Sequence, residues 1–147
     1  MDWGETRINV RYQETDQMGV VYHANYFVWF EVARTEMMKK NGFNYRELEE
    51  RGVMLPVVDV SCKYHHPSKY DDHVIVRARI KEYKGIKINI EYEAIREQDG
   101  KLLATGETKH VWVNKELKPV RLEKIANDFH NALQDLITIE AKGRSYV

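Results

Sequence analysis

The stretch ETDQMGVVYHANYFVWFEVARTEM, residues 14–37, combines a carboxylate and a glycine with the most hydrophobic helix that the sequence predicts. Residues 24–33 are apolar or aromatic at nearly every position, and the composition of residues 24–41 predicts a helix that ends at Gly42. Because this helix is apolar nearly all round, we expect it to be buried on most sides. One flat sheet covers only one side of a helix, so the stretch predicts a curved sheet wrapped about a central helix.

The segments around this helix predict the strands of that sheet. Residues 5–13 alternate polar and apolar side chains and predict a short strand, whereas residues 44–52 predict a short helix with Asn44 as its N-cap. Beyond them, an alternation typical of strands runs through residues 54–67, 73–83, 86–97 and 102–114. Asp99 and Gly100 predict a hairpin turn before the last of these strands.

The end of the chain predicts an amphipathic helix over residues 122–137, with apolar side chains at helical spacing. The sequence contains no internal repeat, low-complexity segment or linker. We therefore expect a single α+β domain over residues 1–147, with a core of about residues 6–137 and a C-terminal tail of residues 138–147.

Composition and charge exclude several classes of protein. At 147 residues, 43% of them hydrophobic, the chain has the size and composition of one globular domain. Its 23 basic and 23 acidic residues give no net charge to attract nucleic acid or an anionic membrane. The single cysteine, Cys62, excludes an internal disulfide and fits a reducing compartment. No signal peptide and no membrane-spanning stretch is recognisable, so we expect a cytoplasmic protein without nucleic-acid partners.

The run from Asp16 through Gly19 to Tyr26 resembles the signature of hotdog-fold acyl-CoA thioesterases. The similarity is to the 4-hydroxybenzoyl-CoA thioesterase-like group, and most to its branch encoded beside the bacterial tol–pal genes. The motifs ARTEM (33–37) and HPSKYDD (66–72) extend the resemblance over about residues 6–130. It implies a hotdog fold, a long central helix wrapped by a curved antiparallel sheet. It also implies homodimers joined sheet edge to sheet edge, often paired into homotetramers, with active sites at the interface and no cofactor.

Such a site needs a base or nucleophile near the thioester carbon and donors for the oxygen that becomes negative. A helix N-terminus offers unpaired N–H groups and partial positive charge, and Gly19 lets the preceding loop pack closely against it. We expect the backbone N–H at about His23 to be the oxyanion donor, worth on the order of 3 kcal/mol. Asp16 either attacks the thioester or activates water, and the sequence leaves both routes open.

The resemblance implies roles for further residues of the same stretch. Tyr12 corresponds to a tyrosine that accompanies the acid and could hydrogen-bond it, and the His23 side chain could position water or protonate the departing thiolate. Substrate-binding positions implied in the same way are Gly19, Val20, Val21, Tyr22 and Asn25. Simpler roles remain open, since Asp16 and Asn25 could be caps and Tyr12 could only pack at a strand end. We expect Glu31 to form an ion pair with Arg34 or another partner.

Other activities fit the sequence less well. The six histidines lack the spacing of a metal site, and no serine-nucleophile or phosphate-loop motif is present. A hotdog dehydratase would pair a strand histidine with a helix carboxylate and would lack the loop at Asp16. The two alternatives to an acyl-CoA hydrolase are a non-catalytic acyl-CoA sensor or scaffold and a thioesterase that acts on acyl carrier protein.

Overall fold

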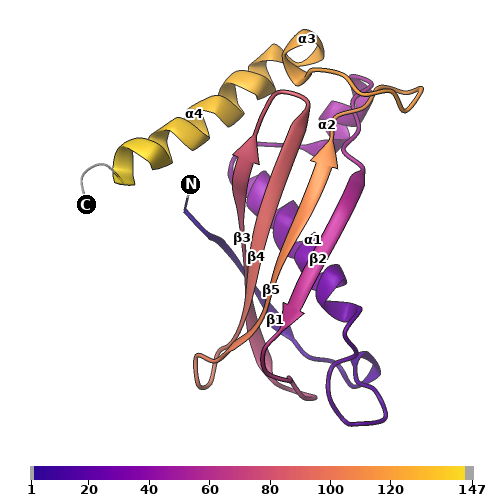
Figure 1. The fold of residues 1–147 in the computed structure, drawn as a ribbon, viewed down its shortest axis with the longest axis vertical. Helices are drawn as coiled ribbons and strands as arrows, with labels where there is room; N and C mark the ends of the chain where they lie inside the picture. The colour runs from indigo at the N-terminus through magenta and orange to yellow at the C-terminus, as the bar shows by residue number, and fades with distance from the viewer. Residues whose placement is uncertain (1, 145–147) are drawn as a thin grey trace.

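The computed structural model describes residues 2–144, and its centre is a five-stranded antiparallel sheet with one long helix against it (Figure 1). The strands lie in the order β1-β3-β4-β5-β2. Their bounds are β1 Gly4–Asn9, β2 Val57–Tyr64, β3 His73–Tyr83, β4 Lys87–Arg96 and β5 Leu102–Val111. The helices are α1 Asn25–Lys40, α2 Tyr45–Glu50, α3 Leu122–Ile125 and α4 Asn127–Arg144, with a short 3-10 turn, η1, at Tyr12–Glu14. The predicted α+β class and curved antiparallel sheet are confirmed.

Helix α1 packs one face against the sheet and leaves another open to solvent. Its side chains that face the sheet recur at helical spacing and are buried: Tyr26, Trp29, Phe30, Ala33, Met37 and Met38. Val28 is 51% exposed and Val32 is 39% exposed, on the opposite side. The expectation that α1 is buried on most sides was therefore wrong, because an apolar composition does not say which side the sheet covers.

Seating α1 on the sheet depends on a glycine in β5. Phe30 stacks on Tyr92 with ring centroids 4.5 Å apart and planes 14° from parallel. A Cβ atom at Gly106 would lie 2.9 Å from Phe30 Cζ and 3.0 Å from the carbonyl oxygen of Ser61 on β2. Close approach of the helix to the sheet therefore requires glycine at this position.

Four predicted elements differ clearly in extent from those observed. The strand predicted over residues 102–114 ends at Val111. β1 ends at Asn9, so Tyr12 lies in η1 and not in a strand. The strand predicted over residues 54–67 extends only over β2. The single C-terminal helix is two helices, α3 and α4, broken at Ala126 (φ −140°, ψ 69°), and α4 continues past residue 137 to Arg144. The helical spacing of apolar residues could not reveal the break, because the buried side chains keep that spacing on both sides of it: Leu122, Ala126, Phe129 and Leu133. None of the helices within residues 2–144 is long and apolar enough to cross a membrane.

Strand β2 is an edge of the sheet and is unusually exposed. It pairs with β5 on one side, and the sheet ends with it on the other. Three of its apolar side chains are open to solvent, namely Val57 (44%), Val58 (60%) and Val60 (47%). An apolar edge strand of this kind offers unpaired backbone groups to another strand.

A chain of polar side chains is buried between α1 and the sheet. Arg34 donates a hydrogen bond to the Tyr92 hydroxyl (3.3 Å), which is 2.6 Å from Thr108 Oγ1, and that oxygen is 2.7 Å from His110 Nε2. Within the described residues Glu31 forms no ion pair with Arg34 or with any other residue, so that expectation was wrong. Glu31 is exposed instead.

His110 should make the protein less stable in mild acid. Burial, and then the positive charge of Arg34, lower the pKa of His110 from 6.5 to about 4. The unfolded chain therefore takes up a proton between those two pH values and the folded chain does not, so stability falls as pH drops from about 6.5 to 4, by on the order of 3 kcal/mol. Urea unfolding at several pH values should show this fall in the wild type and a shallower one in His110→Gln. Equal pH slopes in the two proteins would contradict the assignment.

Candidate active site

Asp16 lies in a tight loop that its own backbone and carboxylate hold together. The backbone N–H of Asp16 donates to the backbone carbonyl oxygen of Val20 (2.9 Å). The backbone N–H of Gly19 donates to the backbone carbonyl oxygen of Asp16 (3.0 Å). Gly19 has a φ of 78°, which glycine adopts without strain. Asp16 Oδ1 accepts a hydrogen bond from the Met18 N–H (2.8 Å), and its second oxygen has no hydrogen-bond partner among the described residues. That oxygen is available for chemistry.

The head of α1 presents two backbone donors. The Val21 N–H donates to the backbone oxygen of Ser68 and the Tyr22 N–H to that of Glu14, each at 2.8 Å. The hydrogen bonds of the helix itself begin at the Asn25 N–H. Between them, the N–H groups of His23 and Ala24 make no hydrogen bond within residues 2–144. They are the unpaired donors expected at a helix start, and they lie seven and eight residues after Asp16. An oxyanion could accept hydrogen bonds from them.

Glu14 ties the Asp16 loop to α1. It is 5% exposed, and its carboxylate accepts hydrogen bonds from Trp29 Nε1 and from the Arg11 N–H, both at 2.8 Å. Its backbone oxygen accepts from the Tyr22 N–H and from Asn25 Nδ2, also at 2.8 Å. The N-cap of α1 is Ala24 and not Asn25. The Asn25 side chain also does not line the pocket at this end of the helix. Sequence analysis missed Glu14, although an acid within a short loop beside a tryptophan-bearing helix is a possible signal.

The loop, the first turn of α1 and the end of β2 line an open pocket of about 290 Å³. Its lining consists of Asp16, Met18, Val20, Val21, Tyr26, Tyr64, His65, His66 and Pro67. Tyr64 donates from its hydroxyl to the His23 oxygen (2.9 Å), so β2 also fixes the head of α1. Sequence analysis missed the wall from Tyr64 to Pro67, which comes from a distant part of the chain.

Ionisable groups beside the pocket are held in their neutral forms. Burial raises the pKa of the Tyr26 hydroxyl, which is 2.8 Å from Ser68 Oγ. Burial also raises the pKa of Tyr64 and that of the Cys62 thiol. A thiol with a raised pKa is a poor nucleophile at neutral pH, which agrees with a structural role for Cys62. Within residues 2–144 no three His, Cys, Asp or Glu side chains are grouped closely enough to hold a metal ion.

The structure brings some of the predicted site residues together and leaves others apart. Asp16, Val20 and Val21 line the pocket, and Gly19 shapes its loop. The side chains of Tyr22 and His23 are exposed, with their rings 4.5 Å apart, and the His23 ring is 6.1 Å from that of Tyr64. Tyr12 lies outside the pocket, is 75% exposed and contacts the ring of Tyr70 at 5.9 Å.

A helix seated on a curved antiparallel sheet, with an acid loop at its head, is the arrangement expected of the hotdog fold. Residues 10–133 match the Thioesterase-like superfamily, and the chain belongs to that superfamily. The predicted resemblance is confirmed at this level.

Individual relatives agree with this assignment. The chain is 42% identical over 135 residues to the putative acyl-CoA thioesterase YneP of Bacillus subtilis, covering 91% of this chain and 97% of YneP. It is 31% identical to the acyl-CoA thioester hydrolase YbgC of Escherichia coli O6:H1, over 80% of this chain and 87% of YbgC. The crystal structure of DHNA-CoA thioesterase from Staphylococcus aureus superimposes with a TM-score of 0.92 at 35% identity, over 97% of this chain and 96% of that one.

Proposed function

We propose that this protein is an acyl-CoA thioesterase, which hydrolyses the thioester of an acyl-CoA to the free acid and CoA. The observation that carries the proposal is the two N–H groups of His23 and Ala24, which have no hydrogen-bond partner in the described part of the chain, beside a pocket lined by Asp16. The similarity to YneP, a putative acyl-CoA thioesterase, and to YbgC, an acyl-CoA thioester hydrolase, supports the same substrate class.

The thioester carbonyl would lie with its oxygen toward the N–H groups of His23 and Ala24. Negative charge develops on that oxygen when the carbonyl carbon is attacked, and these two donors stabilise it together with the partial positive charge of the helix start. They act in both catalytic routes, so the oxyanion site does not depend on which route Asp16 takes.

The unpaired oxygen of Asp16 supplies the attack in one of two ways. As a general base, it takes a proton from water, whose oxygen bonds to the thioester carbon, and the C–S bond then breaks. As a nucleophile, it bonds to that carbon itself and expels the thiolate, and water then hydrolyses the resulting anhydride. In both routes the imidazole of His23 would return a proton to the thiolate. Tyr12 would hydrogen-bond Asp16 in the substrate complex; among the described residues its hydroxyl makes no hydrogen bond and its ring contacts Tyr70.

We also propose that two copies pair through β2. The exposed valines of this edge would be buried by a second β2, which would continue the sheet across a two-fold axis. Tyr64 ends β2 and lines the pocket, so a partner paired along this edge would border the site. A homotetramer would be a pair of such dimers.

A purified sample tests both statements. Thiol release should be measured over a panel of acyl-CoAs with short, medium, long and aromatic acyl groups, with the molar mass determined by light scattering. We expect turnover of at least one class and a mass of two or more 17.4 kDa chains. Absence of thiol release over the whole panel would refute the hydrolase, and tight binding without turnover would favour the sensor. A single-chain mass would refute the pairing of β2.

A further inference from the structure

The pocket wall from His65 to Pro67 belongs to a connecting segment, residues 65–72, that is neither helix nor strand. Hydrogen bonds join this segment to the site on one side, since the Ser68 oxygen accepts from the Val21 N–H (2.8 Å) and Ser68 Oγ is 2.8 Å from the Tyr26 hydroxyl. On the other side, the N–H groups of His65 and His66 donate to the Leu103 oxygen (2.8 and 3.2 Å). The geometry of the wall therefore depends on what fixes the rest of the segment.

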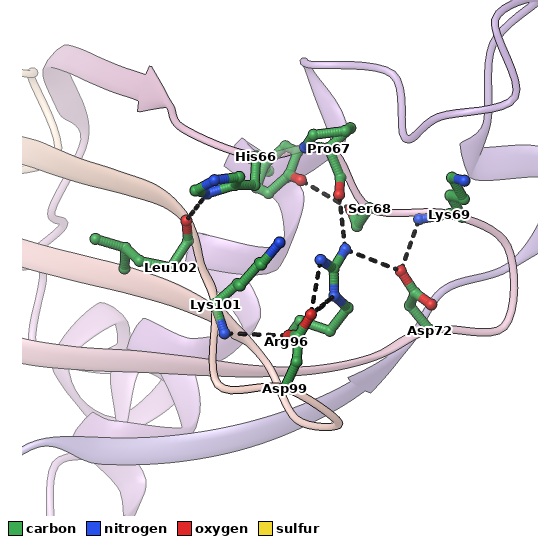
Figure 2. A network of polar contacts seen from close by, with 10 residues as sticks. His66, Pro67, Ser68, Lys69, Asp72, Arg96, Asp99, Lys101 and Leu102 are labelled. Atoms are coloured by element: carbon green, nitrogen blue, oxygen red, sulfur yellow. Dashed lines mark hydrogen bonds and ion pairs between the residues drawn. The ribbon is translucent and has the colours of Figure 1, made fainter.

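Arg96, at the end of β4, is one of the groups that fix it (Figure 2). Backbone hydrogen bonds of Val10 with Asp71 and Asp72 also hold the segment. Its side chain is 14% exposed, and its Nη1 donates to the Pro67 oxygen at 2.9 Å and lies 3.7 Å from Asp72 Oδ2. Asp72 Oδ2 in turn accepts from the Lys69 N–H (2.9 Å). One guanidinium thus links Pro67, in the pocket wall, with Asp72, at the far end of the same segment.

A second carboxylate orients the guanidinium. Asp99, in the turn between β4 and β5, accepts from Arg96 Nε on both oxygens (3.1 Å) and from Nη2 at 3.0 Å. This fork-to-fork arrangement holds the guanidinium plane, and a lysine could not reproduce it. Nη1 is left directed at Pro67, whose oxygen is its only backbone hydrogen-bonding group, because proline has no N–H.

We propose that Arg96 is a positioning residue for the substrate pocket, acting through the Pro67 carbonyl to hold the wall from His65 to Pro67 in place. The inference rests on the proposed function. Arg96 does not line the pocket, and within the described residues its hydrogen bonds and ion pairs reach neither Asp16 nor the head of α1. Its loss should therefore weaken substrate binding and leave the chemical step largely intact.

The test compares KM with kcat in Arg96→Gln, Arg96→Lys and Arg7→Gln on the best acyl-CoA of the panel. Loss of a charge-assisted hydrogen bond in Arg96→Gln should raise KM about tenfold or more, with kcat within about threefold of wild type. Arg96→Lys, which keeps a cationic donor without the fork, should be intermediate. Arg7→Gln is the matched control, because Arg7 pairs with Glu97 (2.8 Å) next to the same turn but not with the segment.

Each outcome decides the inference. A folded Arg96→Gln protein with unchanged KM, or with a loss confined to kcat, would overturn it. If Arg96→Gln does not fold, Asp99→Asn takes its place, since it weakens the paired hydrogen bonds that direct Arg96 Nη1 at the Pro67 oxygen, and an unchanged KM there overturns the inference instead. Wild-type protein that releases no thiol contradicts the proposed function, whereas an active wild type with an unaffected Arg96 variant contradicts only this role of Arg96.

Discussion

Asp16→Asn should lower kcat/KM for acyl-CoA hydrolysis by about a thousandfold or more, because an amide neither attacks a thioester nor accepts the proton of water. The substitution preserves the loop, since the amide oxygen can still accept the hydrogen bond from the Met18 N–H. The rate of thiol release by wild type and variant, measured side by side on the same acyl-CoA, gives this ratio.

Two controls separate chemistry from structure in this experiment. The variant should keep the molar mass and the urea midpoint of the wild type, and Gln17→Ala, an exposed change in the same loop, should leave activity within about twofold. If Asp16→Asn is as active as the wild type, the chemistry belongs to another residue, and His23 would be tested next.

Gly106→Ala should lower the free energy of unfolding by about 3 kcal/mol, the upper part of the usual range for overpacking a core. The added methyl would be pressed between the ring of Phe30 and the backbone of β2, and neither can move freely. Phe30 is held by its stack on Tyr92, and Ser61 is held in the ladder between β2 and β5. Urea unfolding followed by circular dichroism measures the loss.

A double-mutant cycle identifies the steric cause. Phe30→Leu removes the ring that the methyl would meet, so Gly106→Ala should destabilise Phe30→Leu protein by clearly less than it destabilises the wild type. Thr105→Ala, at the neighbouring position of β5, should change stability by well under half as much as Gly106→Ala. Additive effects of Gly106→Ala and Phe30→Leu would show that the ring is not the obstacle.

The positions of several strands and turns were predicted well from the sequence, because neighbouring residues along the chain determine them. Alternating side chains place β3 and β4 within one residue of their observed bounds, since along most of each strand one face is buried and the other is only half-buried. The Asp99–Gly100 turn also lies where the dipeptide predicts it, with Gly100 at a φ of 69°. The position of Asp16 before the helix was likewise visible, because loop and helix are contiguous in the chain.

The remaining features depend on contacts between distant residues. Tyr64 reaches the His23 carbonyl across 41 positions, and Arg96 reaches Pro67 across 29. Nothing in the periodicity of either segment indicates these partners. Glu14 was overlooked for a related reason: a glutamate near Arg11 is ordinarily a solvated ion pair, and only the tertiary contact with Trp29 makes it a buried anchor.

The position of Tyr64 at the end of an edge strand has a thermodynamic consequence. Under the proposed pairing of β2, the strand that meets a second chain is also the strand that lines the pocket, so substrate occupancy and self-association are linked equilibria. If association of two chains raises their affinity for substrate by some factor, bound substrate must raise the affinity between the chains by the same factor. Dilution would then weaken substrate binding, and saturating acyl-CoA would hold the assembly together at protein concentrations where the unliganded chains separate.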